Sequence, residues 1–378
     1  MTSRWVSKTL GEFAPFKYGK GLPQRERSAG PYPVIGSGGV SGSHVAPLVQ
    51  GPALVVGRKG TVGSVFYMPK GCWPIDTAYY IEDDVEQRDL RFTFYMLKTL
   101  CLEGMNQDSA VPGLNREHAH RITILVPPLD EQRRIAGVLG ALDDLIEVNR
   151  RLVSDLDASV RLVGLEALAS AQGRPLVPLT EIADVAKGYS YRSSELIPGD
   201  GWLVNLKNIG RSGTFEARGF KPLTATVKAH HLVENGDVLV AQTDLTQDRE
   251  VIARPVRLRK GTLVGRLVAS LDLAIVRPKA PHTRESIFAI LNTEDFRAHA
   301  LGYCNGTTVL HMGARALPDY FAPSLTGDEI EGLTARVSPL YEAADALNIE
   351  ISDLEATRDE LLPLLMSGRV RVSEELAA

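Results

Sequence analysis

The chain has 378 residues, and 42 Lys and Arg against 46 Asp and Glu give it a formal net charge of −4. Its 44% apolar and 23% charged residues are typical of a globular protein with a buried core, which excludes a mainly disordered or collagen-like chain. Three widely separated cysteines, Cys72, Cys101 and Cys304, argue against a disulfide framework or a zinc ribbon. Because no apolar run approaches the roughly 20 residues that cross a bilayer, we expect a cytoplasmic protein.

The predicted elements follow one another in the same order twice. Residues 1–126 contain short strand patterns bounded by Gly, Pro, Asn and Asp, interrupted by a short helix near Leu90–Leu100. A helical segment follows at 127–172. Short strand patterns return at 173–325, and the segment 326–378 is again helical. We therefore expect two β-rich domains, each followed by a long helix.

The two halves also share residues in the same order along the chain. Four positions recur 169 residues later: Leu10, Glu12, Ala14 and Gly19 as Leu179, Glu181, Ala183 and Gly188. Farther along, Asp130-Glu131 recurs as Asp328-Glu329. Because the whole period is about 190 residues, far longer than a solenoid repeat, the pattern indicates a duplicated domain.

Both helical segments carry apolar residues at alternating intervals of four and three, the pattern of a helix–helix seam. The first segment has Ile135, Leu142, Leu145, Asn149 and Leu152 in this pattern, and the second has Leu340, Leu347, Leu354 and Arg358. Pro339 predicts a break between a short helix and a longer one. A single stripe also fits a helix lying on its own domain, but two such helices favour an antiparallel pair. The sequence thus predicts an α+β fold, with two similar β-rich globular domains joined and spaced by two long antiparallel helices.

Charge separates along the same boundaries. Residues 1–126 hold 14 Lys and Arg against 11 Asp and Glu, and residues 173–325 hold 19 against 15, so the two domains are +3 and +4. The segments 127–172 and 326–378, with 5 against 8 and 4 against 12, are −3 and −8. Weakly basic domains on acidic helices suit a protein whose domains contact phosphates while its helices contact protein. A solvated helix face is an alternative explanation of the acidic segments.

Motifs that carry catalytic chemistry are missing from the sequence. It contains no Gly-x4-Gly-Lys-[Ser/Thr] phosphate loop, no Gly-x-Ser-x-Gly elbow and no Asn-Pro-Pro-Tyr or Asp-Pro-Pro-Tyr tetrapeptide. The pairs His118-x-His120 and His230-His231 lack the spacing of a metalloprotease helix, and we interpret these histidines as surface residues. The sequence therefore favours binding over catalysis.

Several loops combine cations, aromatic rings and glycines, a combination that lets arginine and backbone N–H groups approach DNA phosphates and base edges. The candidate DNA contacts of the first domain are Tyr18, Lys20, Arg25, Ser37, Arg58 and Lys59. Those of the second domain are Lys187, Tyr189, Arg192, Lys207, Asn208, Gln242 and Thr243. For each residue taken alone, ordinary surface decoration remains the alternative.

A series of motifs runs through the chain. It consists of Tyr32-Pro-Val-Ile-Gly-Ser-Gly-Gly-Val, Val56-Gly-Arg-Lys-Gly-Thr-Val-Gly, Trp73-Pro-Ile-Asp-Thr-Ala-Tyr-Tyr, Ser109-Ala-Val-Pro-Gly-Leu-Asn, Val126-Pro-Pro-Leu-Asp-Glu-Gln-Arg-Arg-Ile, Asp143-Asp144-x-Ile146-x2-Asn149 and Leu354-x3-Arg358-Asp-Glu-Leu-Leu-Pro. The series closely resembles the DNA-specificity (S) subunit of type I restriction-modification systems over nearly the whole chain. The resemblance adds Gln132 and Ile146 to the expected helix and subunit interface.

The resemblance implies that 1–126 and 173–325 are target-recognition domains, that 127–172 is a central spacer helix, and that 326–378 is a C-terminal spacer helix and tail. Each domain would read one half of a bipartite, asymmetric site in double-stranded DNA. Two modification (methyltransferase) subunits and the restriction (ATPase-nuclease) subunits would join this chain. S-adenosylmethionine, ATP and Mg²⁺ would be bound by those partners, so this chain would hold no metal or cofactor and catalyse no reaction.

Two alternatives stay open at this point. The chain could fill the specificity role in a type IIB-like restriction enzyme with a fused nuclease-methyltransferase partner, which cleaves on both sides of its site. It could also be a two-domain interaction protein with no role on DNA.

Overall fold

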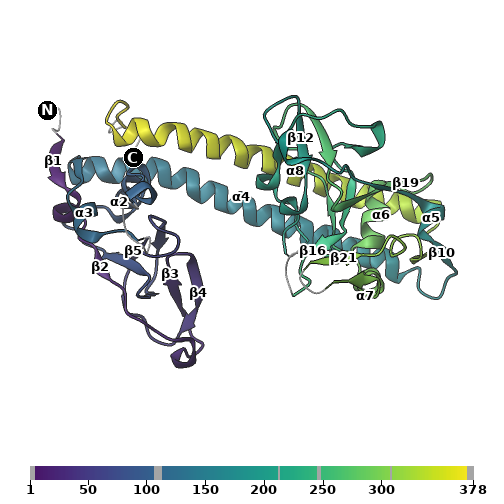
Figure 1. Cartoon of the computed structure of the whole chain (residues 1–378), viewed down its shortest axis with the longest axis horizontal. Coiled ribbons are helices and arrows are strands. Elements are labelled where there is room, and N and C mark those ends of the chain that lie inside the picture. The colour runs from purple at the N-terminus through teal and green to yellow at the C-terminus, as the bar shows by residue number, and fades with distance from the viewer. Residues whose placement is uncertain (1–4, 106–112, 212, 245–247, 307–308, 373–378) are drawn as a thin grey trace. The chain divides into compact units, whose positions relative to one another are not determined.

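The computed structural model describes residues 5–105, 113–211, 213–244, 248–306 and 309–372. The chain divides into two compact units. Figure 1 colours the chain by residue number. Unit 1 consists of Met1–Ile146 and Leu354–Ala378, and unit 2 consists of Glu147–Asp353. The long helices α4 (Leu129–Ala169) and α8 (Gly327–Met366) each contribute residues to both units.

Unit 1 is a β-rich domain together with the first part of α4 and the last part of α8. Its strands are β1 (Val6–Thr9), β2 (Lys17–Tyr18), β3 (Tyr32–Gly36), β4 (Gly39–His44), β5 (Ala53–Gly57), β6 (Val65–Met68), β7 (Trp73–Pro74), β8 (Ala78–Glu82) and β9 (Thr123–Val126). Its short helices are α1 (Leu10–Phe13), α2 (Leu90–Thr99) and α3 (Arg116–His120), with 3-10 turns η1 (Gln24–Glu26) and η2 (Leu102–Met105). The sheet orders are β1-β9, β2-β8-β5-β6 and β4-β3-β7.

Unit 2 has the same kind of domain. Its strands are β10 (Leu176–Pro178), β11 (Ala183–Lys187), β12 (Gly201–Val204), β13 (Lys221–Leu223), β14 (Leu232–Val233), β15 (Val238–Ala241), β16 (Thr243–Asp244), β17 (Pro255–Arg257), β18 (Arg266–Ala269), β19 (Leu273–Pro278), β20 (Cys304–Asn305), β21 (Leu310–Met312) and β22 (Phe321–Pro323). Its short helices are α5 (Leu179–Ile182), α6 (Arg284–Leu291) and α7 (Glu294–Leu301), with 3-10 turns η3 (Ser193–Glu195), η4 (Leu206–Asn208), η5 (Ala217–Gly219) and η6 (Ala229–His231). The sheet orders are β10-β22, β11-β19-β15-β17, β13-β12-β18-β14 and β16-β21-β20.

The two domains share one topology, which confirms the predicted duplication. The antiparallel sheet β2-β8-β5-β6 of unit 1 corresponds to β11-β19-β15-β17 of unit 2. In the adjoining sheets β3 pairs with β7 in parallel, as β12 pairs with β18. Gly19 and Gly188 pass so close to a neighbouring strand that a Cβ atom would lie 2.1 Å from the carbonyl oxygen of Ile75 and 2.0 Å from that of Ser270. Only glycine permits this approach, so the repeated residue has the same structural cause in both halves.

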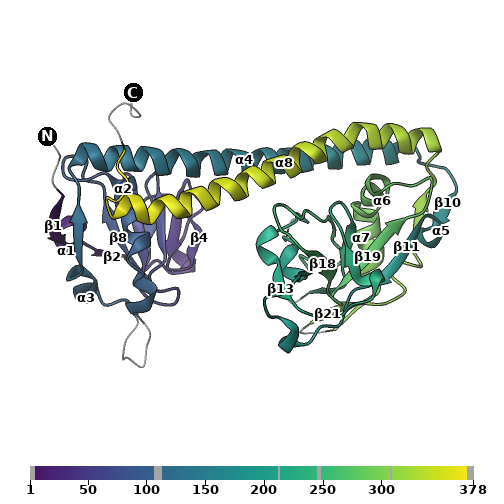
Figure 2. The same ribbon diagram turned by 90° about the horizontal axis from the view of Figure 1, so that it is seen from above.

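A short helix closes the core of each domain. In unit 1, α2 is capped by Asp89 and buries Phe92 and Leu97 in a core that includes Ile135 of α4. In unit 2, α6 lies beside α8 (Figure 2), where Phe288 packs against a buried cluster that includes Val337 and Tyr341. Burial of each such side chain stabilises the fold by about 1.5–3 kcal/mol. The long helices are therefore part of the domain cores.

The two long helices run antiparallel, as predicted. In unit 2, Glu166 of α4 accepts from Arg336 of α8 at 2.6 Å, and Ser170 contacts Glu329 at 3.5 Å. Residue numbers therefore rise along α4 in the direction in which they fall along α8. In unit 1, Arg358 donates to Asp143 at 2.8 Å. The Glu329 carboxylate caps the start of α8 and accepts two hydrogen bonds from Arg174, which lower the pKa of Glu329 to about 2.

The predicted seam is wrong by one residue at two positions of α4. Leu145 and Leu152 are 41% and 45% exposed, whereas their neighbour Ile146 is only 1% exposed and Val153 is half-buried. Each site has two adjacent apolar residues, and a heptad pattern can be drawn through either of them. The sequence pattern does not show which of the two is buried.

Pro339 was expected to end a short helix, and this prediction is also wrong. Helix α8 continues through Pro339 as one element of 40 residues. A proline inside a helix removes one hydrogen bond and crowds the carbonyl four residues earlier. Pro339 lies on the exposed face, while Val337 and Tyr341 are buried on the packed face of the same turns. We infer that this packing offsets the cost of the proline.

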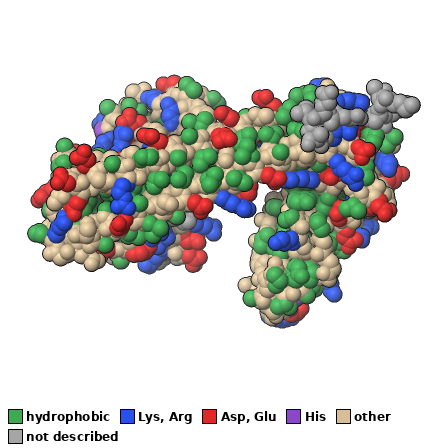
Figure 3. Space-filling view, turned by 180° about the vertical axis from the view of Figure 1, so that it is seen from behind, with side chains coloured by type: hydrophobic (Ala, Val, Ile, Leu, Met, Phe, Trp, Pro, Cys, Tyr) green, Lys and Arg blue, Asp and Glu red, His purple; other side chains and the backbone are tan. Residues whose placement is uncertain are grey.

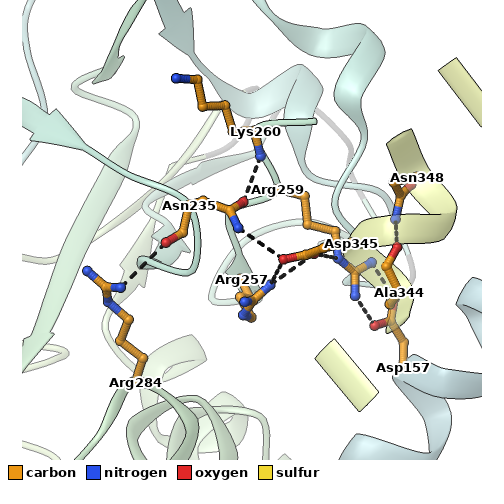
Figure 4. Close-up of polar contacts among 9 residues, drawn as sticks. All are labelled: Asp157, Asn235, Arg257, Arg259, Lys260, Arg284, Ala344, Asp345 and Asn348. Carbon is orange, nitrogen blue, oxygen red and sulfur yellow. Dashed lines mark hydrogen bonds and ion pairs between the residues drawn. The ribbon is translucent and has the colours of Figure 1, made fainter. Parts of the chain in front are cut away.

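The buried Arg259 and the half-buried Arg257 hold the domain of unit 2 on both long helices (Figure 4). Arg259 donates to Asp157 of α4, and its Nε lies 3.3 Å from a carboxylate oxygen of Asp345 of α8. Arg257 donates to both oxygens of Asp345 at 3.0 and 3.1 Å, with its guanidinium carbon 4.3 Å from the centre of the Tyr341 ring. The Arg259 side chain is only 7% exposed. The cluster therefore joins the domain to two helices through ion pairs in which each charge compensates its partner.

Replacing Arg259 with alanine is expected to lower the free energy of unfolding by about 3–5 kcal/mol, because Asp157 and Asp345 would keep their burial and lose a cation. The matched control is Arg336→Ala, whose ion pair with Glu166 has side chains 51% and 69% exposed and should change stability by less than about 1 kcal/mol. Denaturant unfolding followed by circular dichroism measures both variants. Equal losses would show that the buried cluster is no stronger than a surface pair.

Candidate nucleic-acid interface

In unit 1, two arginines lie over one exposed tyrosine at the end of β2. The Tyr18 ring is 50% exposed, and its centre lies 5.0 Å from the guanidinium carbon of Arg58 and 4.9 Å from that of Arg116. Tyr79 packs edge-on against Tyr18 with 5.1 Å between ring centres, and Arg58 donates to the Asp76 carbonyl at 3.2 Å. Contacts with aromatic rings orient a guanidinium while leaving N–H donors for a ligand. We refer to Tyr18, Arg58 and Arg116 as the arginine–tyrosine stack.

The short helix α3 positions Arg116 in this stack. Asn115 caps α3 by accepting from the N–H of His118 at 3.1 Å. At the other end of α3, Nε2 of His120 accepts from the N–H of Phe16 at 2.9 Å, two residues before Tyr18. This acceptor must be an unprotonated nitrogen, and burial, together with the nearby Arg116 charge, lowers the pKa of His120. The neutral imidazole thus ties α3 to β2.

The remaining predicted residues of unit 1 differ in their exposure. Lys59 is exposed next to Arg58, and Lys20 is exposed just after β2. Ser37 is only 8% exposed. Arg25 lies on η1 with its side chain 85% exposed, and its ion pair is with the adjacent Glu26, so it does not join the arginine–tyrosine stack.

The corresponding edge of unit 2 gathers Lys187, Tyr189 and Arg192 near one carboxylate. The Tyr189 hydroxyl donates to Glu195 at 2.9 Å, and the backbone N–H of Arg192 donates to the other oxygen of Glu195 at 2.7 Å. The Tyr189 ring lies 5.6 Å from that of His231, whose Nδ1 is 3.1 Å from the carbonyl oxygen of Lys187. Lys187 and Arg192 are exposed. We refer to these residues as the lysine–tyrosine edge.

Asn208 and Thr243 face the interior of unit 2, which corrects their assignment as DNA contacts. Asn208 is fully buried, accepts from the N–H of Asn205 at 2.9 Å and donates to the carbonyl of Glu216 at 2.8 Å. Thr243 is 8% exposed, and its hydroxyl donates to Asp272 at 3.0 Å. Polar loop side chains often satisfy buried backbone groups, and a sequence does not distinguish that role from ligand contact.

Two predicted DNA contacts of unit 2 have side chains that are at least partly exposed to solvent. Lys207 is exposed and Gln242 is half-buried, and both stay predictions. Ser109–Pro112, the first part of one resemblance motif, lie outside the described residues.

Arg116 and His120 are the residues that sequence reasoning missed. The pair His118-x-His120 was interpreted as surface histidines, which is correct for exposed His118 and wrong for half-buried His120. Asn115 directly before Arg116 is a helix-cap signal that would have predicted α3. The contact between α3 and β2 joins residues more than 100 positions apart, so the sequence carried no sign of it.

The predicted helix-interface residues lie where α4 and α8 meet their domains and each other. Gln132 is buried and joins α4 to the start of α2 by accepting from the N–H of Asp89 at 2.9 Å. Arg358 and the hydroxyl of Tyr95 both donate to Asp143, at 2.8 and 2.5 Å. The other predicted residues are buried, as for Ile135, Ile146 and Asn149, or half-buried, as for Leu142, Leu340, Leu347 and Leu354.

The outer surface of the helices is both acidic and apolar. Figure 3 shows hydrophobic side chains beside Asp and Glu side chains along the helices. On α4, Leu145, Val148 and Leu152 are 41–50% exposed at intervals that place them on one helix face. Such a stripe is more typical of a protein contact than of a solvated helix.

Within the described ranges, no group of three or more His, Cys, Asp or Glu side chains could hold a metal ion. Likewise, none of the helices built from those residues is long and apolar enough to cross a membrane. Burial raises the pKa of the Cys72 thiol to about 11, which disfavours a thiolate nucleophile at that position.

His120→Ala is expected to destabilise the protein by about 1–3 kcal/mol at pH 7.5, because the N–H of Phe16 loses its acceptor. Because the pKa of His120 is lowered by folding, its contribution is fully present above about pH 6.5 and is lost as the pH falls through the pKa of the folded state. Thermal unfolding at pH 7.5 and 5 should therefore differ less in His120→Ala than in the original protein. His118→Ala is the control, since exposed His118 should leave this pH dependence unchanged. The same pH dependence in both variants would contradict the assignment.

Residues 2–157 match the family described as the type I restriction modification DNA specificity domain. Over 342 residues, 82% of this chain and 77% of the relative, the chain is 20% identical to the specificity subunit of the type I restriction enzyme MjaVIII of Methanocaldococcus jannaschii. It is 25% identical over 143 residues to the EcoprrI specificity subunit of Escherichia coli, with 36% of each chain covered. Both relatives belong to type I enzymes, so the type IIB-like alternative is not favoured.

The fold has a counterpart among solved structures. The crystal structure of a type I restriction-modification S subunit from M. genitalium matches with a TM-score of 0.61 over 96% of both chains, at 15% identity. That structure shares the fold of this chain. Residues 2–157 match the type I specificity domain, and the chain is similar in sequence to the specificity subunits of two type I restriction enzymes.

Proposed function

We propose that this chain reads a bipartite, asymmetric site in double-stranded DNA, with one half-site recognised by each domain. One observation carries the proposal: a single topology is used twice with unlike loops at corresponding positions. After β5, Arg58 lies in the exposed arginine–tyrosine stack, whereas after β15 the residues Thr243 and Asp244 are buried. Unlike loops on one scaffold provide two different reading surfaces and thus suit two unlike half-sites.

We further propose that α4 and α8 set the length of the unread spacer. Each helix has residues in both units. In unit 1, Asp143 of α4 accepts from Tyr95 of the domain and from Arg358 of α8. In unit 2, Asp157 of α4 and Asp345 of α8 bind arginines of the domain. A helix extends by 1.5 Å per residue. The number of residues between these contacts would therefore determine the separation of the half-sites.

In this proposal the chain itself carries out no chemistry. Two modification subunits would bind S-adenosylmethionine and methylate adenine, and restriction subunits would use ATP and Mg²⁺. The helical segments 127–172 and 326–378, with charges of −3 and −8, and the exposed apolar stripe of α4 support docking of protein subunits there. The domains, at +3 and +4, are left for DNA.

Long-read mapping of N6-methyladenine in the host, with and without this gene, tests the proposed function directly. We expect one methylated motif made of two half-sites separated by a fixed number of unread bases, and its loss when the gene is deleted. An unchanged methylation map after deletion would contradict the proposal.

Arg58→Ala should weaken recognition of only the half-site that is read by unit 1, by about 1–3 kcal/mol, because Arg58 is positioned to contact a base edge. Binding to duplexes mutated in either half-site measures this effect in the complex with the modification subunits. Arg25→Ala is the control, since Arg25 is exposed outside the stack. An equal loss of binding affinity for all duplex sequences would instead indicate that Arg58 contacts a phosphate.

Removing one heptad from each long helix should shorten the spacer. Deleting Val148–Ser154 and Ile349–Glu355 together leaves Asp143, Asp157, Asp345 and Arg358 in place, and it removes about 10 Å of helix, which corresponds to about three base pairs. The half-sites should stay the same, and methylation mapping reads both quantities. A deletion in only one helix is the control, because it breaks the antiparallel register and should abolish methylation. An unchanged spacer in the double deletion rules out the helices as the ruler.

A further inference from the structure

Unit 2 contains a cavity whose lining includes four cations and two carboxylates. The cavity has a volume of about 640 Å³, within the range of roughly 300–1,000 Å³ that is usual for ligand sites. Its walls come from β14, β18, the end of β19 and the start of α6. The charged residues that line it are Lys260, Arg266, Arg277, Arg284, Glu234 and Asp237. The lining therefore has two more positive than negative charges.

Two of these cations are neutralised by carboxylates. Arg284 pairs with Glu234 and with Asp237 at the start of α6. Arg266 pairs with Asp200 at 3.1 Å. Since these guanidinium groups already have carboxylate partners, they contribute little net attraction for an anion.

The other two cations, Lys260 and Arg277, have no carboxylate partner within the described part of the chain. Arg277 donates to the carbonyls of His230 at 3.3 Å and Leu232 at 2.7 Å, which fixes its guanidinium and leaves other N–H groups unused. In Figure 4 the Lys260 ammonium extends away from Asn235. The hydrogen bond between these two residues involves only the backbone N–H of Lys260. A fixed guanidinium beside an unpaired ammonium is an arrangement suited to phosphate oxygens.

The cavity adjoins the lysine–tyrosine edge of the same unit. Arg277 holds η6 and the start of β14 through the carbonyls of His230 and Leu232, and between these two lies His231, which contacts both Lys187 and Tyr189. The pKa of His230 is lowered by burial and by its cationic neighbours, including Arg277. The cavity and the predicted reading edge are thus connected through the contacts of η6.

We propose that this cavity binds the sugar-phosphate backbone of DNA, with Lys260 and Arg277 contacting phosphate oxygens next to the half-site that unit 2 reads. The inference rests on the proposed function. It adds a contact to the DNA backbone that does not depend on the base sequence. Continuity with the lysine–tyrosine edge favours a DNA phosphate over an acidic protein segment. Neutralising phosphates releases counterions, so each contact should steepen the salt dependence of binding by about 0.9 in log–log slope.

The test measures binding of the full chain to fluorescent 30-base-pair duplexes, over a salt series that begins at low ionic strength. The variants are Lys260→Gln, whose side chain makes no hydrogen bond or ion pair with the described residues, and Lys260→Gln combined with Arg277→Gln. Arg315→Gln is the matched control, since it also removes one charge from unit 2 but pairs with Asp319 outside the cavity. Thermal unfolding verifies that each variant folds. Competition with inorganic phosphate and with a ten-residue polyglutamate peptide separates DNA from other anions.

We expect the salt slope to fall by about 1 in the single variant and about 2 in the double variant, equally for all duplex sequences, and to stay unchanged in Arg315→Gln. An unchanged slope in a folded double variant that keeps its sequence preference overturns the inference and leaves the proposed function standing. A loss of polyglutamate binding with an unchanged DNA slope assigns the cavity to an acidic protein. Binding of inorganic phosphate alone, again with an unchanged slope, overturns it too. If the original protein binds all duplex sequences equally and the variants still lower the salt slope, the result contradicts the proposed function and supports the inference.

Discussion

Hydrogen bonds and ion pairs to helix aspartates hold each domain on the long helices, and the proposed reading of DNA depends on this attachment. In unit 2, Arg259 lies between Asp157 of α4 and Asp345 of α8. In unit 1, Asp143 of α4 accepts from Tyr95 of α2 and from Arg358 of α8. Burying one of these charges without its partner costs several kcal/mol. The contacts therefore form only when the domain and both helices are in place, and we infer that they specify orientation more than they add stability.

Charge has a different task in each part of the chain. A net charge of −4 argues against nucleic acid when it is taken as a single sum, but it is made up of +3 and +4 on the domains and −3 and −8 on the helical segments. The small excess on each domain is concentrated by structure. Arg58 and Arg116 meet at one exposed tyrosine, although Arg116 also pairs with Glu117. Lys260 and Arg277 line one cavity, and neither has a carboxylate partner among the described residues. With so few uncompensated cations we expect weak DNA binding by the chain alone and tight binding only with its partners.

Much of the architecture could be predicted because it depends on local pattern and on repetition. Gly19 and Gly188 recur since both halves need the same close backbone approach, and the heptad pattern identified two helices that pack along one face. Where two apolar neighbours competed, as at Leu145 and Ile146, the pattern had no means of choosing. Pro339 was misread for a related reason, because local propensity ignores the packing on the opposite face of the helix.

The sequence by itself determined the duplication, the alternation of domain and helix, the distribution of charge and the likeness to type I specificity subunits, since each of these can be read from residue order and composition. Only the tertiary structure decided which polar side chains face a ligand. Asn208 and Thr243 have the chemistry of base contacts, yet their hydrogen-bonding groups are used inside the domain. Arg116 and His120 looked unremarkable in the sequence, yet a hydrogen bond between α3 and β2 places them at the arginine–tyrosine stack. The difference arises because burial and partner choice depend on contacts between residues far apart in the chain.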